Sequence, residues 1–223
     1  MAHRVSRSGF GTRSSRFRAL GSVPVADGVR RSMDIGLALL GLALMAPVLL
    51  IAILALRLEG GGPVLFRQWR GGAHGQPFRI WKLRTLSVTE DGEAVRQVTR
   101  SDPRLTPVGA ILRRLSIDEA PQLVNVLRGE MALVGPRPHP IALDRRFGAM
   151  LPAYRRRFAV RPGMTGWAQV SGDRGPVLTL GAMAHRLEAD LWYVDNRSWH
   201  LDARILLRTI PVVLRDAIRA RPS

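Results

Sequence analysis

The segment IGLALLGLALMAPVLLIAILAL, from Ile35 to Leu56, holds 22 consecutive residues without a charge. As a helix it would just cross a hydrocarbon core of about 30 Å, because each residue adds about 1.5 Å. A secretory signal has a shorter apolar region, of about 7–15 residues, followed by a small-x-small cleavage site. Here 34 residues precede the segment and Arg57-Leu58-Glu59 follows it. We therefore interpret it as a membrane helix and not as a cleaved leader.

Pro47 and the flanking charges favour a helix that enters and leaves the membrane by the same face. Pro47 has no N–H to donate, and its ring clashes with the carbonyl of Ala43. It leaves 12 apolar residues before it and nine after it, which correspond to about 18 Å and 14 Å of helix, too short to cross alone. Arginines flank both ends, and such flanks stay in the cytoplasm. Prolines also occur in spanning helices, so the re-entrant form is favoured and the spanning form is left open.

The whole chain has 223 residues and a formal net charge of +17. Its hydrophobic content of 46% is too high for a disordered polybasic chain, so we expect a packed core. The absence of cysteine excludes disulfides, Cys-ligated zinc, iron–sulfur clusters and thiol catalysis. The charge calls for an anionic partner: nucleic acid, acidic lipid or a phosphorylated substrate. Lys82 is the one lysine among 33 arginines, a hint that an ammonium has a role there.

Both ends of the chain add to this basic character. We predict that residues 1–31, rich in arginine, form a disordered arm that binds anionic lipid, or an unstructured extension. Between Leu201 and Ala220 four arginines would share one face of a helix, with apolar residues on the other faces. That helix either lies on anionic lipid or packs against the core with a solvated arginine face, and the sequence leaves both open.

A short strand pair is expected at residues 64–84. The glycines at 60–62 and 71–75 predict turns, and they form no Walker loop because no Gly-Lys-Ser/Thr follows. The residues from Phe78 to Thr85 alternate between apolar and polar, which predicts a half-buried strand.

The adjacent acids Asp118 and Glu119 stand just before a helical pattern at Leu123 to Leu127. Ser116-x-x-Glu119 matches a capping box, which is a purely structural role. Pro121 would then be the fifth helical residue, where its missing N–H is costly, so it indicates a later helix start. The acids would lie just ahead of that helix or in its first turn, where the helix dipole favours ionised carboxylates. With two arginines beside them they suit metal binding or phosphorus chemistry, and the residues alone do not decide between these roles and the structural one.

Ordered pieces between about residues 31 and 213 match one known family. These pieces are Arg31 and Asp34, Gly62-Pro63-Val64, Phe78, Lys82-Leu83-Arg84-Thr85, Leu115–Leu123, Gly129–Pro138, Arg161–Gly172 and Tyr193-Val194-Asp195-Asn196. In them the chain resembles the bacterial sugar transferases, the monotopic phosphoglycosyl transferases of polyprenol-linked glycan synthesis. It resembles the minimal form, because it lacks the multi-span N-terminal region of larger relatives.

The resemblance implies a specific reaction. Members of this family transfer a sugar 1-phosphate from a UDP-sugar to a polyprenyl phosphate, usually undecaprenyl phosphate, and release UMP. In the family's Asp-Glu pair the Asp is the nucleophile, so Asp118 would form a covalent aspartyl-phosphosugar. Family members use Mg²⁺, or Mn²⁺ in its place, and Asp118 and Glu119 would help to hold that ion.

The resemblance also implies which other side chains line the site. By motif position Lys82, Arg84, Arg113 and Arg137 would bind phosphate oxygens. Two further positions, Trp167 and Gln169, would border the nucleotide, although a Trp in such a turn is as well explained as a packing anchor.

For the fold, residues and resemblance together predict a monotopic, mainly helical α+β protein. It would comprise a basic tail at 1–31, a Pro47-kinked re-entrant helix at 32–58 and a catalytic domain at 59–223. The resemblance places that domain on the cytoplasmic face of the bacterial inner membrane, beside anionic lipid. The sequence leaves self-association, the sugar and the glycan pathway open.

Two departures from the family pattern bear on these expectations. Ala46 replaces a Ser that many relatives have before the membrane proline, which weakens the re-entrant assignment because Ser can bond backbone groups freed at a kink. Ala120 replaces a Leu after the acid pair and leaves the carboxylates intact. The alternative enzyme is a glycosyl transferase that releases UDP. A membrane-tethered nucleic-acid-binding protein is disfavoured, because the arginines are dispersed and aromatic residues make up only 6% of the chain.

Overall fold

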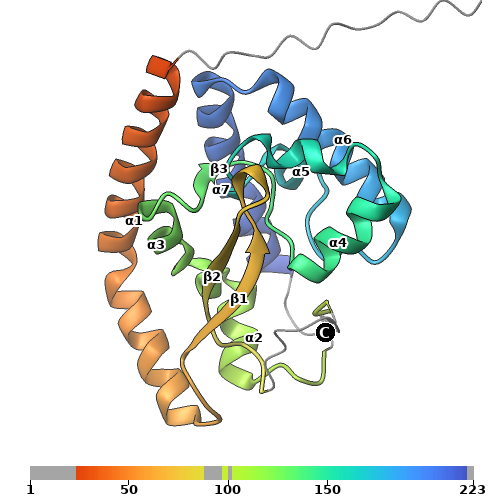
Figure 1. Cartoon of the computed structure of the whole chain (residues 1–223). Helices are drawn as coiled ribbons and strands as arrows, with labels where there is room; N and C mark the ends of the chain where they lie inside the picture. The colour runs from red at the N-terminus through yellow and green to blue at the C-terminus, as the bar shows by residue number, and fades with distance from the viewer. Residues whose placement is uncertain (1–23, 88–96, 100–101, 220–223) are drawn as a thin grey trace, which may run out of the picture.

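The structure, a computed structural model, describes residues 24–87, 97–99 and 102–219 (Figure 1). Most of the predicted arm, up to residue 23, lies outside the described residues. The helices are α1 (Pro24–Glu59), α2 (Pro107–Arg114), α3 (Gln122–Leu127), α4 (Ile141–Met150), α5 (Trp167–Val170), α6 (Leu180–Asn196) and α7 (Trp199–Arg219). The strands are β1 (Leu65–Gly71), β2 (Pro77–Leu83), β3 (Ala132–Val134) and β4 (Gly163–Thr165), and short 3₁₀ turns lie at Ala73–Gly75, Ile117–Glu119 and Tyr154–Ala159. The predicted mainly helical α+β class is confirmed.

Helix α1 is longer than predicted. It begins at Pro24 instead of residue 32, and it continues through Pro47 to Glu59. Figure 1 shows one gently curved helix along one side of the molecule. Contacts with the rest of the chain hold the turns on both sides of the proline, so the hydrogen bond lost at Ala43 does not end the helix.

One stripe of α1 packs against the rest of the chain along most of its length. Ala38, Ala52 and Leu56 are buried in this stripe. At Gly41 the fit is close, because an added Cβ would lie 3.2 Å from a methyl carbon of Leu123 in α3. The first half of α1 therefore packs on α3, and its last turns pack on the cluster that contains Leu112 of α2.

Polar side chains fasten the first third of α1 to the same body. Arg31 donates to the carbonyl oxygens of Val126 and Leu127, at 2.6 and 2.8 Å, and so satisfies the end of α3. Asp34 accepts the backbone N–H of Leu133 at 3.0 Å. These contacts explain why residues 24–31, predicted as part of the tail, belong to the helix.

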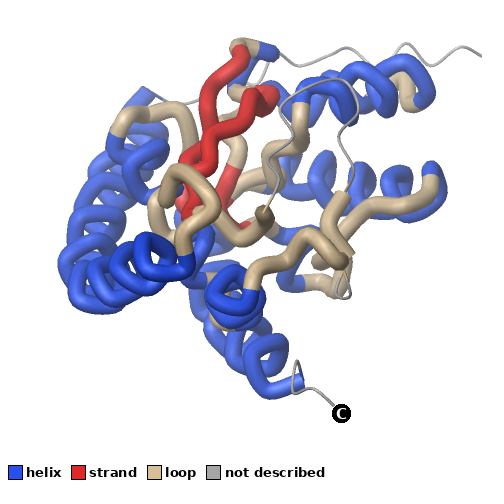
Figure 2. The backbone as a smooth tube through the Cα atoms, turned by 90° about the horizontal axis from the view of Figure 1, so that it is seen from below, coloured by secondary structure: helices blue, strands red, loops and turns tan. Residues whose placement is uncertain are grey.

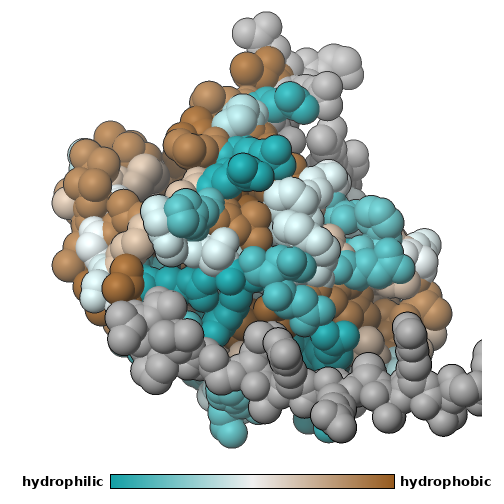
Figure 3. All heavy atoms as spheres, turned by 90° about the horizontal axis from the view of Figure 1, so that it is seen from above, coloured by the Kyte–Doolittle hydropathy of each residue, from teal (hydrophilic) through white to brown (hydrophobic). Residues whose placement is uncertain are grey.

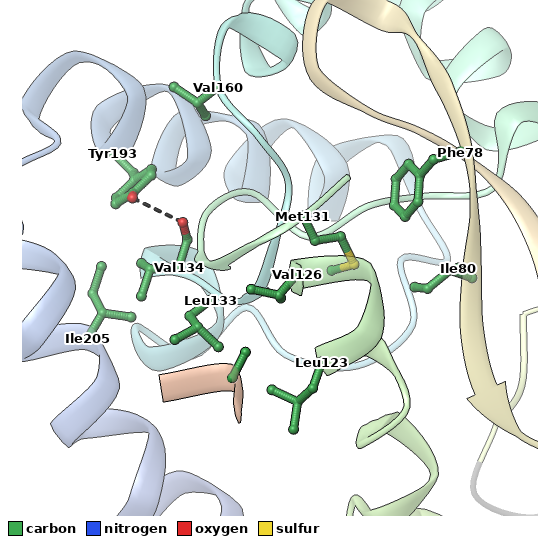
Figure 4. Packing of buried hydrophobic residues seen from close by; sticks show 11 residues of the cluster. Phe78, Ile80, Leu123, Val126, Met131, Leu133, Val134, Val160, Tyr193 and Ile205 are labelled. Atoms are coloured by element: carbon green, nitrogen blue, oxygen red, sulfur yellow. Dashed lines mark hydrogen bonds between the residues drawn. The ribbon is translucent and has the colours of Figure 1, made fainter. Parts of the chain in front are cut away.

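The hairpin of β1 and β2 provides one wall of the main core. The two strands are antiparallel, and Lys82 lies opposite Phe66. Phe78 and Ile80 of β2 are buried, and Figure 4 shows them beside Met131 and the side chains of α3. The C-terminal end of β2, where Lys82 lies, is thereby fixed near the segment that carries Asp118 and Glu119.

The second sheet is a short parallel pair, in which Ala132 lies opposite Gly163 and Val134 opposite Thr165. Figure 2 shows that helices surround both pairs of strands, with α1 along one edge. Tyr193 of α6 ties the parallel pair to the helices through a hydrogen bond to the carbonyl of Val134 (Figure 4).

The outer side of α1 is an exposed apolar surface. Leu44, Ile51 and Leu58 are 69%, 70% and 80% exposed. Figure 3 shows apolar atoms gathered over this side of the molecule. Among the described residues, α1 is the one helix long and apolar enough to cross a membrane, and few of its side chains are buried. Leu207 and Ile210 of α7 add further exposed apolar side chains.

Candidate active site

The acid pair lies on a 3₁₀ turn, Ile117–Glu119, between α2 and α3. Ser116 enters this turn in the left-handed conformation, with φ of 56°, and makes no capping hydrogen bond, so the capping box is not formed. Helix α3 begins at Gln122 after Pro121. The prediction that both acids stand just ahead of a helix that starts later is confirmed.

Glu119 is held by two cations from different parts of the chain. Its Oε1 accepts from Nζ of Lys82 at 2.6 Å and from Nη2 of Arg137 at 2.5 Å, and its Oε2 lies 3.3 Å from Nη1 of Arg137. Burial alone would raise the pKa of Glu119, but Arg137 and Lys82 together hold it well below its usual range. Glu119 is therefore ionised, and it keeps both cations in place beside Asp118.

Asp118 is buried, with 5% of its surface exposed. Among the described residues none donates a hydrogen bond to it. Burial raises the pKa of Asp118 to about 6, against the attraction of Lys82 and with the help of the negative charge on Glu119. A poorly solvated carboxylate whose lone pairs are not engaged is available as a nucleophile or as a metal ligand.

Asn125 sets the distance between Lys82 and the acid pair. Its side chain is fully buried in α3. The Asn125 amide accepts from the N–H of Trp81 at 2.9 Å and donates to the carbonyl of Arg79 at 2.8 Å. The amide thus bonds the backbone of β2 as a neighbouring strand would. These bonds fix β2, including Lys82, against α3. Neither pattern nor motif singled out this residue.

Arg157 fixes the backbone at Arg137. Its Nη2 donates to the carbonyl oxygen of Arg137 at 2.6 Å and to Asp190 at 2.8 Å. Arg70 donates to the next carbonyl, that of Pro138, at 3.0 Å. Because both carbonyls are held, the Arg137 side chain leaves the backbone from a fixed point. Sequence reasoning missed Arg157 and Arg70, which no local pattern separates from the other arginines.

The donor set limits how a divalent ion could bind here. The described residues contain no cluster of three or more His, Cys, Asp or Glu side chains suited to a metal. Two adjacent carboxylates are present, and one of them is already paired with two cations. This set fits an ion such as Mg²⁺, which is commonly held by one or two carboxylates together with substrate phosphates.

Comparison with known proteins places the chain in a family. The family model described as bacterial sugar transferase matches residues 25–216. The chain belongs to the bacterial sugar transferase family. The acid pair, Lys82 and Arg137 of this transferase all lie within the matched region.

Several curated relatives of the transferase carry related names. It is 52% identical over 185 residues to the UDP-glucose:undecaprenyl-phosphate glucose-1-phosphate transferase of Caulobacter vibrioides, covering 83% of this chain and 69% of that protein. It is 44% identical to the Escherichia coli K12 protein of the same name, over 88% of this chain and 45% of the relative. The exopolysaccharide production protein PSS of Rhizobium leguminosarum is 43% identical, over 82% of this chain and 93% of the relative. The transferase thus spans less than half the length of the Escherichia coli relative.

Two of the four predicted phosphate-binding side chains meet at Glu119, and a third is near. Arg113, in the last turn of α2, is exposed, and its charge lowers the pKa of Asp118. Lys82 and Arg137 are thus brought together at the acid pair, and Arg113 is an exposed cation close enough for its charge to act on Asp118.

Arg84 is not brought to the acid pair. It is 2% exposed and donates to the carbonyl oxygens of Leu56, Gly60 and Gly62, at 3.0 Å to Leu56 and 2.7 Å to Gly62. These are carbonyls at the end of α1 that lack helical partners. In this structure Arg84 serves the end of α1, and its predicted phosphate role stays a prediction. The strand ends at Leu83, so Arg84 reaches back under α1 instead of continuing along the face of Lys82.

Trp167 and Gln169 lie on α5 and take part in packing. The Trp167 ring stacks against Trp192, with centroids 4.6 Å apart, and packs on the main core. Gln169 is buried and donates to the carbonyl of Met164 at 3.3 Å. These contacts fit the packing-anchor alternative for Trp167. A border with the nucleotide stays a prediction for both residues.

Proposed function

We propose that the chain transfers a sugar 1-phosphate from a UDP-sugar to a polyprenyl phosphate such as undecaprenyl phosphate. A carboxylate oxygen of Asp118 attacks the sugar-bearing phosphorus, the bond to the bridging oxygen breaks, and UMP leaves. A phosphate oxygen of the lipid then attacks the same phosphorus. The acyl-phosphate bond breaks, which gives the polyprenyl diphosphate sugar and restores the Asp118 carboxylate.

The single observation that carries this proposal is the contrast inside the acid pair. Glu119 is paired with Lys82 and Arg137 at 2.6 and 2.5 Å, whereas the neighbouring Asp118 accepts no hydrogen bond from the described residues. A nucleophile needs free lone pairs, and an anionic diphosphate needs fixed cations beside it. The chain supplies both at one site, with Asp118 on the turn and the cations from distant parts of the chain.

The roles of the cations follow from their positions. Lys82 and Arg137, held by Glu119, would stabilise the negative charge that gathers on the phosphate oxygens and the leaving UMP. Arg113, exposed at the mouth, would meet the diphosphate as it enters.

The two acids would also be the ligands of a divalent ion. Asp118 would hold Mg²⁺ or Mn²⁺ together with phosphate oxygens of the substrate, and Glu119 would join once a cation leaves it. When bound, such an ion neutralises charge on the diphosphate. The side chains orient the donor and keep Asp118 poorly solvated until then.

The packing of α1 supports a monotopic position. Ala38 and Leu56 are buried against the domain near the two ends of the apolar segment, while the opposite side of the helix is exposed. A spanning helix would carry this polar domain into the lipid with it. We therefore place α1 with its outer side in the cytoplasmic leaflet of the inner membrane, and the domain on the cytoplasmic face. Both ends of α1 then lie on the same side, as in the re-entrant interpretation.

UMP release tests the reaction. Purified chain, undecaprenyl phosphate, Mg²⁺ and a UDP-sugar should yield UMP, and UDP-glucose is the first donor to use because the Caulobacter and Escherichia coli relatives are named for it. Without acceptor, donor labelled in the sugar phosphate should leave its label on the protein. Asp118→Asn should abolish both signals, whereas Asp173→Asn, on a surface pair with His185, should keep them.

Two results would contradict the proposal. Release of UDP instead of UMP would make the protein a glycosyl transferase. Label retained on Asp118→Asn and lost on Glu119→Gln would move the nucleophile to the other acid.

A further inference from the structure

A second polar pocket lies away from the acid pair, between the first turns of α1, strand β3 and the junction of α6 with α7. Its volume is about 70 Å³. Four arginines line it, namely Arg30, Arg31, Arg161 and Arg197. None of Lys82, Asp118, Glu119 and Arg137 lines it, so it is separate from the candidate active site.

The charges in this pocket leave a positive excess. Three carboxylates, Asp27, Asp34 and Asp202, face the four arginines. Arg197 pairs with Asp27 at 3.2 Å, and Arg30 approaches Asp202 at 3.4 Å. The Arg30 atom in that contact is the buried Nε, which makes no hydrogen bond to Asp202. An anionic oxygen with better geometry in the pocket would satisfy that donor.

The other two arginines use only neutral acceptors for the bonds they make to the chain. Arg31 donates to the carbonyls of Val126 and Leu127, and Arg161 donates to the carbonyl of Gly129 at 3.0 Å. Hydrogen bonds to carbonyls orient these guanidinium groups without cancelling their charge. The pocket is therefore a preformed cationic site.

The rim of the pocket is apolar and adjoins the two helices with exposed apolar faces. Met33 and Leu37 of α1 line it and are 39% and 41% exposed, and Trp199 at the start of α7 is 53% exposed. Figure 3 looks down on this end of the molecule, where the apolar surface of α1 borders hydrophilic atoms. A cationic floor with an apolar rim suits an amphiphilic anion.

We propose that this pocket binds the phosphodiester of an anionic glycerophospholipid, whose acyl chains follow the exposed sides of α1 and α7. The site rests on the membrane position proposed for α1 and not on the transfer chemistry. It would fix the depth and rotation of the protein in the leaflet, because one headgroup would be held by α1, β3 and α7 together.

The test compares lipids in the same detergent micelles. Full-length chain in dodecylmaltoside is titrated with dioleoylphosphatidylglycerol or dioleoylphosphatidylcholine, and thermal unfolding is followed. Phosphatidylglycerol should raise the midpoint in a saturable way, because a ligand of the folded state stabilises it, and phosphatidylcholine should not. Arg197→Gln should raise the lipid fraction needed for half the effect about tenfold.

Two further variants separate the pocket from general charge and from misfolding. Arg156→Gln removes the same charge from a surface pair with Asp195 and should behave like the wild type. Trp199→Ala keeps every charge and alters only an exposed rim residue, so it should weaken the lipid effect several-fold without loss of folding. Asp118→Asn should bind lipid normally, which separates failure of this site from failure of the proposed reaction.

Three outcomes would overturn the proposal. Arg156→Gln could weaken lipid binding as much as Arg197→Gln, which would indicate a diffuse surface effect. Inorganic phosphate could raise the midpoint with the same dependence on Arg197 and none on Trp199, which would indicate a simple anion site. Geranyl phosphate could displace phosphatidylglycerol competitively, which would make the pocket a site for the acceptor.

Discussion

Two buried groups of charges differ in how their carboxylates are bonded. In the cluster around Arg157, Asp190 accepts from Arg157 at 2.8 Å and Asp144 accepts from Tyr154 at 2.7 Å. In the acid pair, Glu119 is bonded, whereas Asp118 accepts no hydrogen bond from the described part of the chain. Burial raises the pKa of Asp118, Asp144 and Asp190 alike, so the pKa direction does not separate the two groups. They differ in that Asp144 and Asp190 each accept a side-chain hydrogen bond and Asp118 does not among these residues.

The largest expected effect is a loss of stability in the Arg157 cluster. Arg157→Met would leave the Asp190 carboxylate buried without its cation, and breaking such a pair costs about 3–5 kcal/mol. We expect the free energy of unfolding, measured with urea in detergent, to fall by that order. The control is the neighbouring Arg156→Met, whose pair with Asp195 is about half exposed and should contribute less than about 1 kcal/mol. Equal effects of the two variants would show that the cluster is not structural.

The contrast between these arginines shows a limit of prediction from sequence. Arg155, Arg156 and Arg157 are consecutive and chemically identical. Only Arg157 turns inward from the 3₁₀ turn, and its partners come from α4, α6 and the segment after β3. No local pattern carries that information, because it depends on how distant elements pack. Asn125 was missed for the same reason.

Other features were predictable because they depend on local chemistry. Pro121 predicted where α3 begins, and the uncharged segment predicted the apolar helix. The family motif predicted phosphate-binding roles for Lys82, Arg137 and Arg84, and these roles stay predictions. The structure brings the first two to the acid pair and places Arg84 at the end of α1, a difference that the alternation of the strand could not foretell because the end of a strand depends on its partner.

The second-largest expected effect is a loss of UMP release when a cation beside Glu119 is removed. It tests whether that cation serves the reaction more than the stability of the fold. Arg137→Gln removes one of the two cations on Glu119. Loss of one charge-stabilising donor costs about 10²–10³-fold in kcat. We expect UMP release to fall by that factor while the unfolding free energy changes less than in Arg157→Met. Arg146→Gln, on the exposed side of α4, is the matched control. Activity above a tenth of wild type in Arg137→Gln would remove this residue from the catalytic machinery.

The smallest effect is the response of Asp118 to pH. Its pKa of about 6 means that the carboxylate is protonated below that pH. Since only the ionised form can attack phosphorus, the rate of label transfer to the protein should fall about tenfold per pH unit well below pH 6. Single-turnover labelling between pH 5 and 8 measures this directly. A flat profile over that range would contradict the expected titration of Asp118, and the labelling of Asp118→Asn would then decide its role alone.

The free energy of unfolding should fall as the pH rises through the pKa of Asp118, whereas the rate of label transfer should rise. The folded-state pKa of Asp118 lies above the usual 3.8, so the folded chain binds this proton more tightly than the unfolded chain does. This contribution to stability is present at low pH and is lost as the pH rises through about 6. A pKa of 6 instead of 3.8 corresponds to roughly 3 kcal/mol at most. Asp118→Asn should therefore be more stable than the wild type at pH 7.5 and equal to it near pH 4.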